Sequence, residues 1–140
     1  MRKVRLLLFL AVVFITTFAA QAQNTPTRFQ KQHLKQTVTG LVKALNTTET
    51  PLMQRQAVQT IRKLEWLFPN EDFVEFVAPL MKLITDENGD TQTRMLAAMA
   101  LDGLHSDEGD NTIVRMSKTS SNKSIQELCM ALAININTEL

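Results

Sequence analysis

The sequence predicts an all-α fold, a short α-solenoid of three stacked helical hairpins. One apolar helix pattern occurs three times, at spacings of 40 and then 32 residues: Met53, Ala57, Ile61, Leu64; Thr93, Ala97, Leu101, Leu104; and Ile125, Cys129, Ala133, Ile136. Repeats of roughly 40 to 47 residues are typical of helical hairpins that bury their apolar faces against their neighbours. No segment of any length shows the strict apolar–polar alternation of a β-strand.

The first hairpin is expected to extend to about Trp66. Its first helix is indicated by apolar residues spaced as on one helix face: Leu34, Val38, Leu41 and Leu45. Thr50 is expected to cap the second helix, because a threonine side chain can accept a hydrogen bond from the first helical turn. Pro51 suits the first helical position, because an N–H group there has no hydrogen-bond partner within the helix and proline lacks that group.

The second hairpin is expected to begin at Asn70, which can cap a third helix. Pro79 lies inside that predicted helix and should kink it by removing one main-chain hydrogen bond. Residues 86–89, Asp-Glu-Asn-Gly, favour a turn. Asp90 is then expected to cap the fourth helix, which contains the clearest copy of the repeated pattern.

The third hairpin is predicted to follow an acidic turn at residues 105–110. A short fifth helix is expected over residues 111–118, and a sixth that starts at Ser120, Ser121 or Asn122. Little polar surface remains on the sixth helix, which carries these apolar residues: Ile125, Leu128, Cys129, Met130, Leu132, Ile134 and Ile136. Either the fifth helix covers them, or this end of the molecule docks to another chain.

The fourth helix resembles the second helix of a HEAT repeat. The order typical of that family is met by Asp90, Thr93-Arg94, Ala97-Ala98 and Ala100-Leu101. The first unit departs from this order at Thr50 and Gln54, and the third at Asn122 and Ile125-Gln126. The resemblance implies a HEAT-like α-solenoid in which Asp90 and Arg94 help join adjacent units.

The first 22 residues have the pattern of a signal peptide. Basic residues precede a run of 13 mostly apolar residues from Leu6 to Phe18, and Ala20 and Ala22 are the small residues before a cleavage point. We expect cleavage after Ala22 and export to the periplasm or the medium, leaving one domain of residues 23–140. The alternative is an uncleaved leader that acts as a membrane anchor.

Charge is unevenly distributed along residues 23–140, although the net charge is only −2. Residues 23–63 have a net charge of +6, whereas residues 64–110 have a net charge of −9. Such polarity can orient a charged partner, but solvated helix faces and acidic loops give the same distribution. A basic stripe with interleaved aromatic residues is absent, so the sequence does not favour nucleic-acid binding.

The sequence contains no recognisable catalytic, cofactor or metal motif. His33 and His105 are the only histidines and lack further ligands at a suitable spacing. Asp86, Asn88 and Asp90 resemble the start of a calcium-binding EF-hand loop, but the glycine and glutamate that such a loop needs are absent. The single cysteine, Cys129, is expected to be a small core residue.

A protein-binding surface is predicted opposite the buried face of the repeated helices. In the first two copies its residues are Arg55, Gln59, Arg62, Met95, Met99 and Asp102. In a solenoid they would line one concave surface, with Met95 and Met99 as adaptable contacts. The alternative is that both methionines lie in the core. Trp66 is expected to close the core rather than to bind a partner.

These features favour an exported, non-catalytic interaction protein, a scaffold or adaptor that binds a protein partner of unknown identity. A small envelope hydrolase or metal-dependent protein is the alternative from another class. A self-associating structural protein, a homo-oligomer, is the third alternative. Membrane association is expected only if the leader stays uncleaved.

Overall fold

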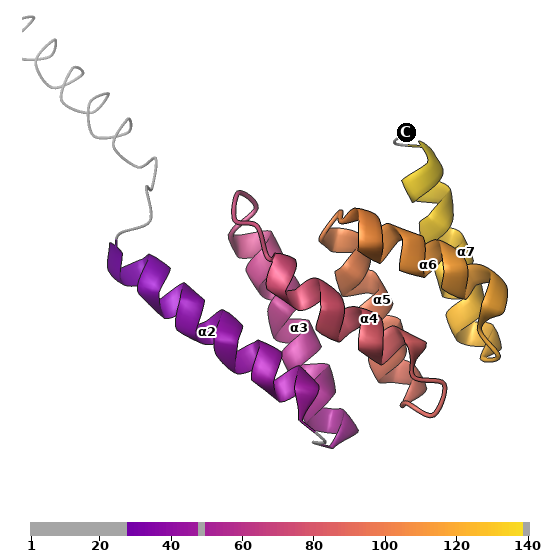
Figure 1. Ribbon diagram of the computed structural model, residues 1–140, viewed down its shortest axis with the longest axis horizontal. Coiled ribbons are helices and arrows are strands. Elements are labelled where there is room, and N and C mark those ends of the chain that lie inside the picture. The colour runs from indigo at the N-terminus through magenta and orange to yellow at the C-terminus, as the bar shows by residue number, and fades with distance from the viewer. Residues whose placement is uncertain (1–27, 48–49, 139–140) are drawn as a thin grey trace, which may run out of the picture. The chain divides into compact units, whose positions relative to one another are not determined.

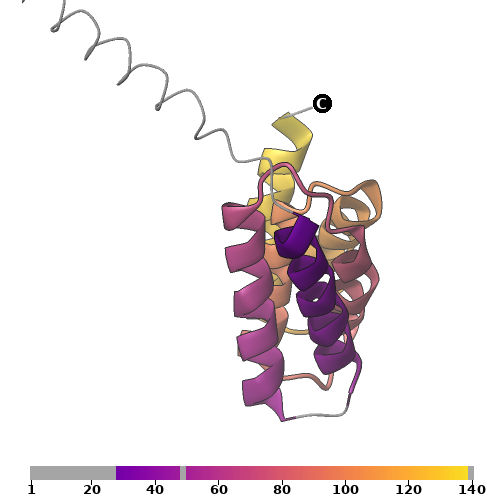
Figure 2. The ribbon, with the colours of Figure 1, turned by 90° about the vertical axis from the view of Figure 1, so that its left-hand side faces the viewer.

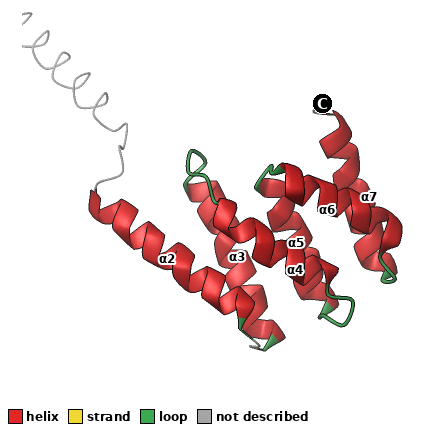
Figure 3. Ribbon diagram, in the orientation of Figure 1, coloured by secondary structure: helices red, strands yellow, loops and turns green. Residues whose placement is uncertain are grey.

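The computed structural model describes residues 28–47 and 50–138, and every regular element in these ranges is a helix (Figure 1, Figure 3). The all-α prediction is therefore confirmed. The predicted signal peptide and its cleavage point lie outside the described residues. Within the described ranges, no helix combines the length and the apolar character that a bilayer crossing requires. The elements are α2 (Arg28–Asn46), α3 (Pro51–Leu67), the 3₁₀-helix η1 (Val74–Phe76), α4 (Val77–Thr85), α5 (Thr91–Gly103), α6 (Asp107–Thr119) and α7 (Lys123–Thr138).

The chain divides into a unit of residues 1–35 and a unit of residues 36–140. In the second unit, α5 contacts α3 and α7, while α4 contacts α6. The pairs α4–α5 and α6–α7 pack as helical hairpins. Seen from the side of α3, that helix stands in front and α5 and α7 lie behind it (Figure 2). The helices α3, α5 and α7 thus form one row, and α4 and α6 pack beside it.

The core of this unit is built around α5. Ala97, Ala98 and Ala100 are fully buried, and their small side chains let neighbouring helices come close. Leu101 is also completely buried. The other helices contribute fully buried apolar residues to the same core: Val58, Ile61, Phe76, Leu80, Ile84, Ile113, Ile125 and Cys129.

Asp90 and Asn122 form helix caps at predicted helix starts, whereas Thr50 does not. The Asp90 carboxylate accepts hydrogen bonds from the Thr93 N–H at 2.9 Å and from its hydroxyl at 2.7 Å. The Asn122 side-chain oxygen accepts from the Ile125 N–H at 3.3 Å, at the start of α7. Thr50 occupies the cap position before Pro51, but its side chain makes no capping hydrogen bond.

The predicted start of the third helix at Asn70 is wrong. Residues 74–76 form a 3₁₀ turn, and the α-helix begins only at Val77. Phe73 and Phe76 are buried in this segment, with their rings stacked 5.8 Å apart. Pro79 is consequently the third residue of α4, where a helix does not require the N–H, so the predicted loss of a hydrogen bond inside the helix is wrong as well.

The predicted acidic turn at residues 105–110 and the predicted start of the fifth helix at residue 111 are also wrong. Helix α6 begins at Asp107, and the Ser106 hydroxyl caps it by accepting from the Gly109 N–H at 3.1 Å. Acidic residues in its first turn interact favourably with the positive end of the helix dipole. A Cβ on Gly109 would lie 2.7 Å from the Ser106 hydroxyl oxygen and 3.0 Å from Leu101 carbon atoms, so glycine leaves room both for this cap and for the packing of α6 on α5.

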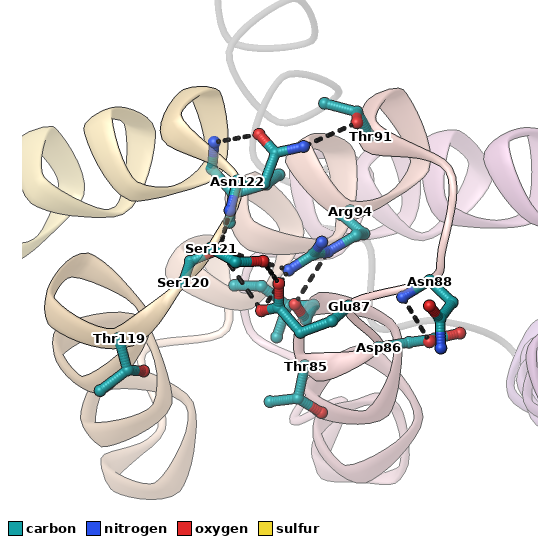
Figure 4. A network of polar contacts seen from close by, with 12 residues as sticks. Thr85, Asp86, Glu87, Asn88, Thr91, Arg94, Thr119, Ser120, Ser121 and Asn122 are labelled. Carbon is teal, nitrogen blue, oxygen red and sulfur yellow. Dashed lines mark hydrogen bonds and ion pairs between the residues drawn. The ribbon is translucent and has the colours of Figure 1, made fainter.

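Arg94 on α5 joins elements that are distant in the sequence (Figure 4). Its side chain is 1% exposed, and it donates to the Glu87 carboxylate at 3.0 Å and to the Ser120 hydroxyl at 3.4 Å. Glu87 also accepts from the Ser121 hydroxyl. This network connects the α4–α5 hairpin to the segment between α6 and α7.

Hydrogen bonds also link the starting turns of the three helices in the row. The Thr93 hydroxyl, whose hydrogen goes mainly to Asp90, also lies 3.4 Å from the Pro51 carbonyl oxygen, and this longer, shared contact links α5 to α3. The Asn122 side-chain amide donates to the Thr91 hydroxyl at 3.0 Å, and thereby links α7 to α5. The amino-terminal ends of α3, α5 and α7 are therefore held in register with one another.

Candidate functional site

The six predicted binding residues lie on two helices that contact each other, α3 and α5. Gln59, Arg62 and Met99 are exposed, whereas Arg55, Met95 and Asp102 are half-buried. The core residues Ala57, Ile61, Ala97 and Leu101 occupy other sides of the same helices. The alternative that both methionines lie in the core is wrong for Met99, which is 37% exposed.

Arg55 belongs to the junction between α3 and α5. Its guanidinium donates a hydrogen bond to the side-chain oxygen of Gln92, the second residue of α5. Its Nε atom is buried without a hydrogen-bond partner. Hydrogen bonds from the Thr93 hydroxyl and N–H lower the pKa of Asp90, and the nearby positive charge of Arg55 lowers it further. Arg55 thus has a structural role in addition to any contact with a partner.

Trp66 is the residue for which the sequence-based interpretation fails most clearly. It was expected to close the core, but its side chain is 80% exposed near the end of α3. One turn before it stand Arg62 and Lys63, also exposed, and Gln59 lies a further turn away. These four residues line a shallow, open depression of about 410 Å³. Its lining combines two positive charges with one large aromatic ring.

Comparisons with known protein families, with curated proteins and with solved structures found no match for this chain.

Helix α7 extends the exposed positions along the row. The residues in register with the candidate set, Glu127, Ala131 and Ile134, are all exposed, and Ile134 is 61% exposed. Met130 is 52% exposed on the same helix. The fifth predicted helix thus does not cover all apolar residues of the sixth, because α6 packs on α7 while these two side chains remain in contact with solvent.

The described residues offer little for metal or thiol chemistry. Among them, no three His, Cys, Asp or Glu side chains come together as a group able to hold a metal ion. Cys129 is completely buried, and burial raises the pKa of its thiol to about 11. A thiol with so high a pKa is a poor nucleophile near neutral pH, because the thiolate is the reactive form.

Proposed function

We propose that this chain is an exported, non-catalytic interaction module that binds a protein partner through the row of α3, α5 and α7. In this proposal the helical hairpins form a short HEAT-like α-solenoid, and the exposed side of the row is its concave face. The proposal for export rests on the signal-peptide pattern of residues 1–22.

The observation that carries the proposal is the pair formed by Trp66 and Arg62 on the exposed side of α3. Tryptophan and arginine are the residues that most often dominate the energy of protein interfaces. Exposure of the apolar indole ring to water is unfavourable in free energy. Trp66 is 80% exposed, so a partner that covers its ring removes this cost. Arg62 and Lys63 beside it favour a partner that presents acidic groups next to an apolar side chain.

Met99 on α5 and Ile134 on α7 extend this surface along the row. Both are exposed apolar side chains, and methionine adapts its shape to different partners. Arg55 and Met95 are less suited to act as primary contacts, because they are half-buried and Arg55 already binds Gln92. The contact surface proposed here is therefore centred on Gln59, Arg62, Lys63, Trp66 and Met99.

The test is a pull-down from cell envelope extract with the purified protein and with an Arg62→Glu/Trp66→Ala variant. The matched control is Arg115→Glu/Val74→Ala. It reverses the charge of one exposed basic residue on α6 and truncates one exposed apolar residue on η1. We expect a partner that is retained by the unchanged protein and by the control, and lost by the Arg62/Trp66 variant. A partner that both variants retain equally, or no partner at all, contradicts the proposal.

Self-association is a second candidate function, favoured by Met130 and Ile134 on α7. Exposed apolar side chains on a helix at the end of a row can pack against a second copy. Light scattering over a range of concentrations tests this directly, with Ile134→Glu as the variant. A mass that rises with concentration and falls back in the variant supports self-association, and a constant monomer mass contradicts it.

A further inference from the structure

A second cavity lies where the carboxyl-terminal ends of α3 and α5 meet the segment that leads to η1. Its volume is about 290 Å³, and it is distinct from the exposed face described above. The residues that line it come from three parts of the chain: Glu65, Phe68, Pro69, Asn70, Glu71, Asp72, Phe73, Gly103, Leu104 and His105.

The cavity presents an excess of negative charge. Three carboxyl groups line it, those of Glu65, Glu71 and Asp72. The last turns of both α3 and α5 lie beside it, and neither turn contains a basic residue. Because the carboxyl-terminal end of a helix carries partial negative charge, both helices add to the negative potential.

Glu65 has a buried oxygen atom that no described group satisfies. Its Oε1 atom is buried without a hydrogen-bond partner. Its Oε2 atom lies 2.7 Å from the position that a Cβ on Gly103 would occupy, so glycine is what allows the carboxyl group to lie against the end of α5. A buried acceptor without a donor is costly, and a rotation of the carboxyl group that turns this oxygen towards the cavity would let a ligand supply the donor.

Two aromatic rings identify the kind of cation that suits this cavity. Phe68 and Phe73 line it beside the carboxyl groups, and Phe73 is fixed by stacking on Phe76. A small inorganic cation prefers a shell of oxygen ligands, which aromatic rings cannot supply. An organic ammonium group on an alkyl chain matches both the carboxyl groups and the aromatic rings of the cavity. Its N–H groups reach the carboxyls, and its methylene groups pack against the rings.

We propose that the cavity between the ends of α3 and α5 binds a primary alkylammonium group, with the Glu65 carboxylate as its principal hydrogen-bond acceptor. Such a group is carried by a free diamine and by a lysine side chain of a protein. The inference does not depend on the interaction proposed for the exposed face, because the residues of the two sites are different.

The raised pKa of the Glu65 carboxyl group supports this assignment. Burial raises the pKa of its carboxyl group to about 7, against the smaller opposing effect of Arg62. The other ionisable groups around it are Glu71 and Asp72 on the segment after α3, and His105 after α5. Titrations are best carried out at about pH 8, where the Glu65 carboxyl is mostly ionised.

The experiment is a titration of the full chain with cadaverine. Binding is monitored through the NMR signals of the backbone amides of Phe68, Gly103, Leu104 and His105. We expect saturable shifts with a dissociation constant on the order of millimolar, since the ligand is small. Pentane-1,5-diol, which has the same length but no charge, should produce no saturable shifts. This comparison uses the unchanged protein and therefore remains decisive if a variant is destabilised.

Three variants locate the site. Glu65→Gln should weaken cadaverine binding at least about tenfold. Gly103→Ala keeps every charge but displaces the Glu65 carboxyl group, and it should weaken binding about fivefold or more. Glu75→Gln is the matched control, because Glu75 is an exposed acid outside the cavity and its change should leave the affinity within about twofold.

Two results would overturn the proposal. One is the absence of saturable shifts at these amides up to about 50 mM cadaverine, well above the expected affinity. The other is equal weakening by Glu65→Gln and Glu75→Gln, which would indicate a diffuse field rather than a site. N-acetyl-lysine methylamide identifies the source of the ammonium group: tighter binding than cadaverine assigns the site to a lysine side chain, and weaker binding assigns it to a free amine.

Discussion

The Nε atom of Arg94 donates a 3.2 Å hydrogen bond to the carbonyl oxygen of Ile84, in the last turn of the preceding helix. A charged side chain that is 1% exposed thus satisfies a main-chain acceptor at the end of α4. The same guanidinium reaches Glu87 and Ser120. These contacts join the α4–α5 hairpin to the segment between α6 and α7. Asp90 acts differently, because its carboxylate caps its own helix.

Replacing Arg94 by alanine should lower the free energy of unfolding by about 2–4 kcal/mol, because several buried hydrogen bonds and the packing of the arginine stem are lost together. Urea denaturation followed by far-UV circular dichroism measures this. The control is Arg115→Ala on α6, an exposed arginine whose loss should cost less than about 0.5 kcal/mol. Equal effects of the two variants would show that the Arg94 network contributes little.

Leu101→Ala should cost about 2–5 kcal/mol, since Leu101 is completely buried between the helices and its removal leaves a cavity. Leu52→Ala on α3 is the matched control, because Leu52 is 57% exposed and its change should cost less than about 1 kcal/mol. The measurement is the shift of the urea midpoint. An unchanged midpoint in the Leu101 variant would contradict the described core.

The sequence was sufficient to predict the helical class and most helix positions, because apolar residues recur at helical spacing and Asp90 and Asn122 have cap chemistry. Local signals were insufficient around residues 70–76 and 105–110. Asn70 has the chemistry of a cap, but burial of Phe73 and Phe76 draws the chain into a 3₁₀ turn instead. The acidic residues after Ser106 resemble a turn, yet they form the first turn of α6.

Repetition in sequence also does not imply equal burial. Met53 and Thr93 occupy equivalent positions of the repeat, but Met53 is 49% exposed whereas Thr93 is 2% exposed. Thr93 faces α3, and its hydroxyl lies 3.4 Å from the Pro51 carbonyl oxygen. Whether a position is covered depends on which helix packs beside it, and a single repeat unit does not contain that information.

The stability of the protein should depend on pH through Glu65. The pKa of its carboxyl group is about 7 in the folded chain, compared with 4.5 as the ordinary value. Between these values the folded state holds a proton that the unfolded state has released, so stability falls as the pH rises from about 4.5 to about 7. Urea midpoints at about pH 5.5 and about pH 8 measure this loss.

The control for this prediction is Glu65→Gln, which cannot ionise. The loss of stability between the two pH values should be smaller in the variant than in the unchanged protein. The carboxyls of Glu87 and Asp90 have lowered pKa values and act in the opposite direction at more acidic pH, so the difference between the two proteins isolates Glu65. Identical pH profiles would show that Glu65 is not buried as described.

Cys129 should resist thiol reagents in the folded protein. Its side chain is completely buried and its pKa is about 11, so a reagent such as Ellman's should react only after the chain opens locally. We expect labelling at about pH 8 to be about 100-fold or more slower than in denaturant. A Cys129→Ser/Met130→Cys variant moves the thiol to a 52% exposed position and should react rapidly.

The candidate binding surface was predictable only in part. Helical spacing was enough to place Gln59 and Arg62 away from the core, but it left open whether Met99 lies in the core. It was not enough to place Trp66, because the apolar run Trp66-Leu67-Phe68 lies at the end of α3 and does not reveal which side chain faces inward. The Glu65 cavity was missed entirely, since its residues are brought together by packing and not by spacing.

Trp66 is the only tryptophan of the chain, and the chain contains no tyrosine. Its indole is already largely surrounded by water in the folded state. Denaturation should therefore change the emission wavelength of the intrinsic fluorescence very little, and this signal will follow unfolding poorly. The same property makes the unlabelled protein a sensitive optical reporter: a shift of its emission to shorter wavelength signals that a molecule has covered the indole.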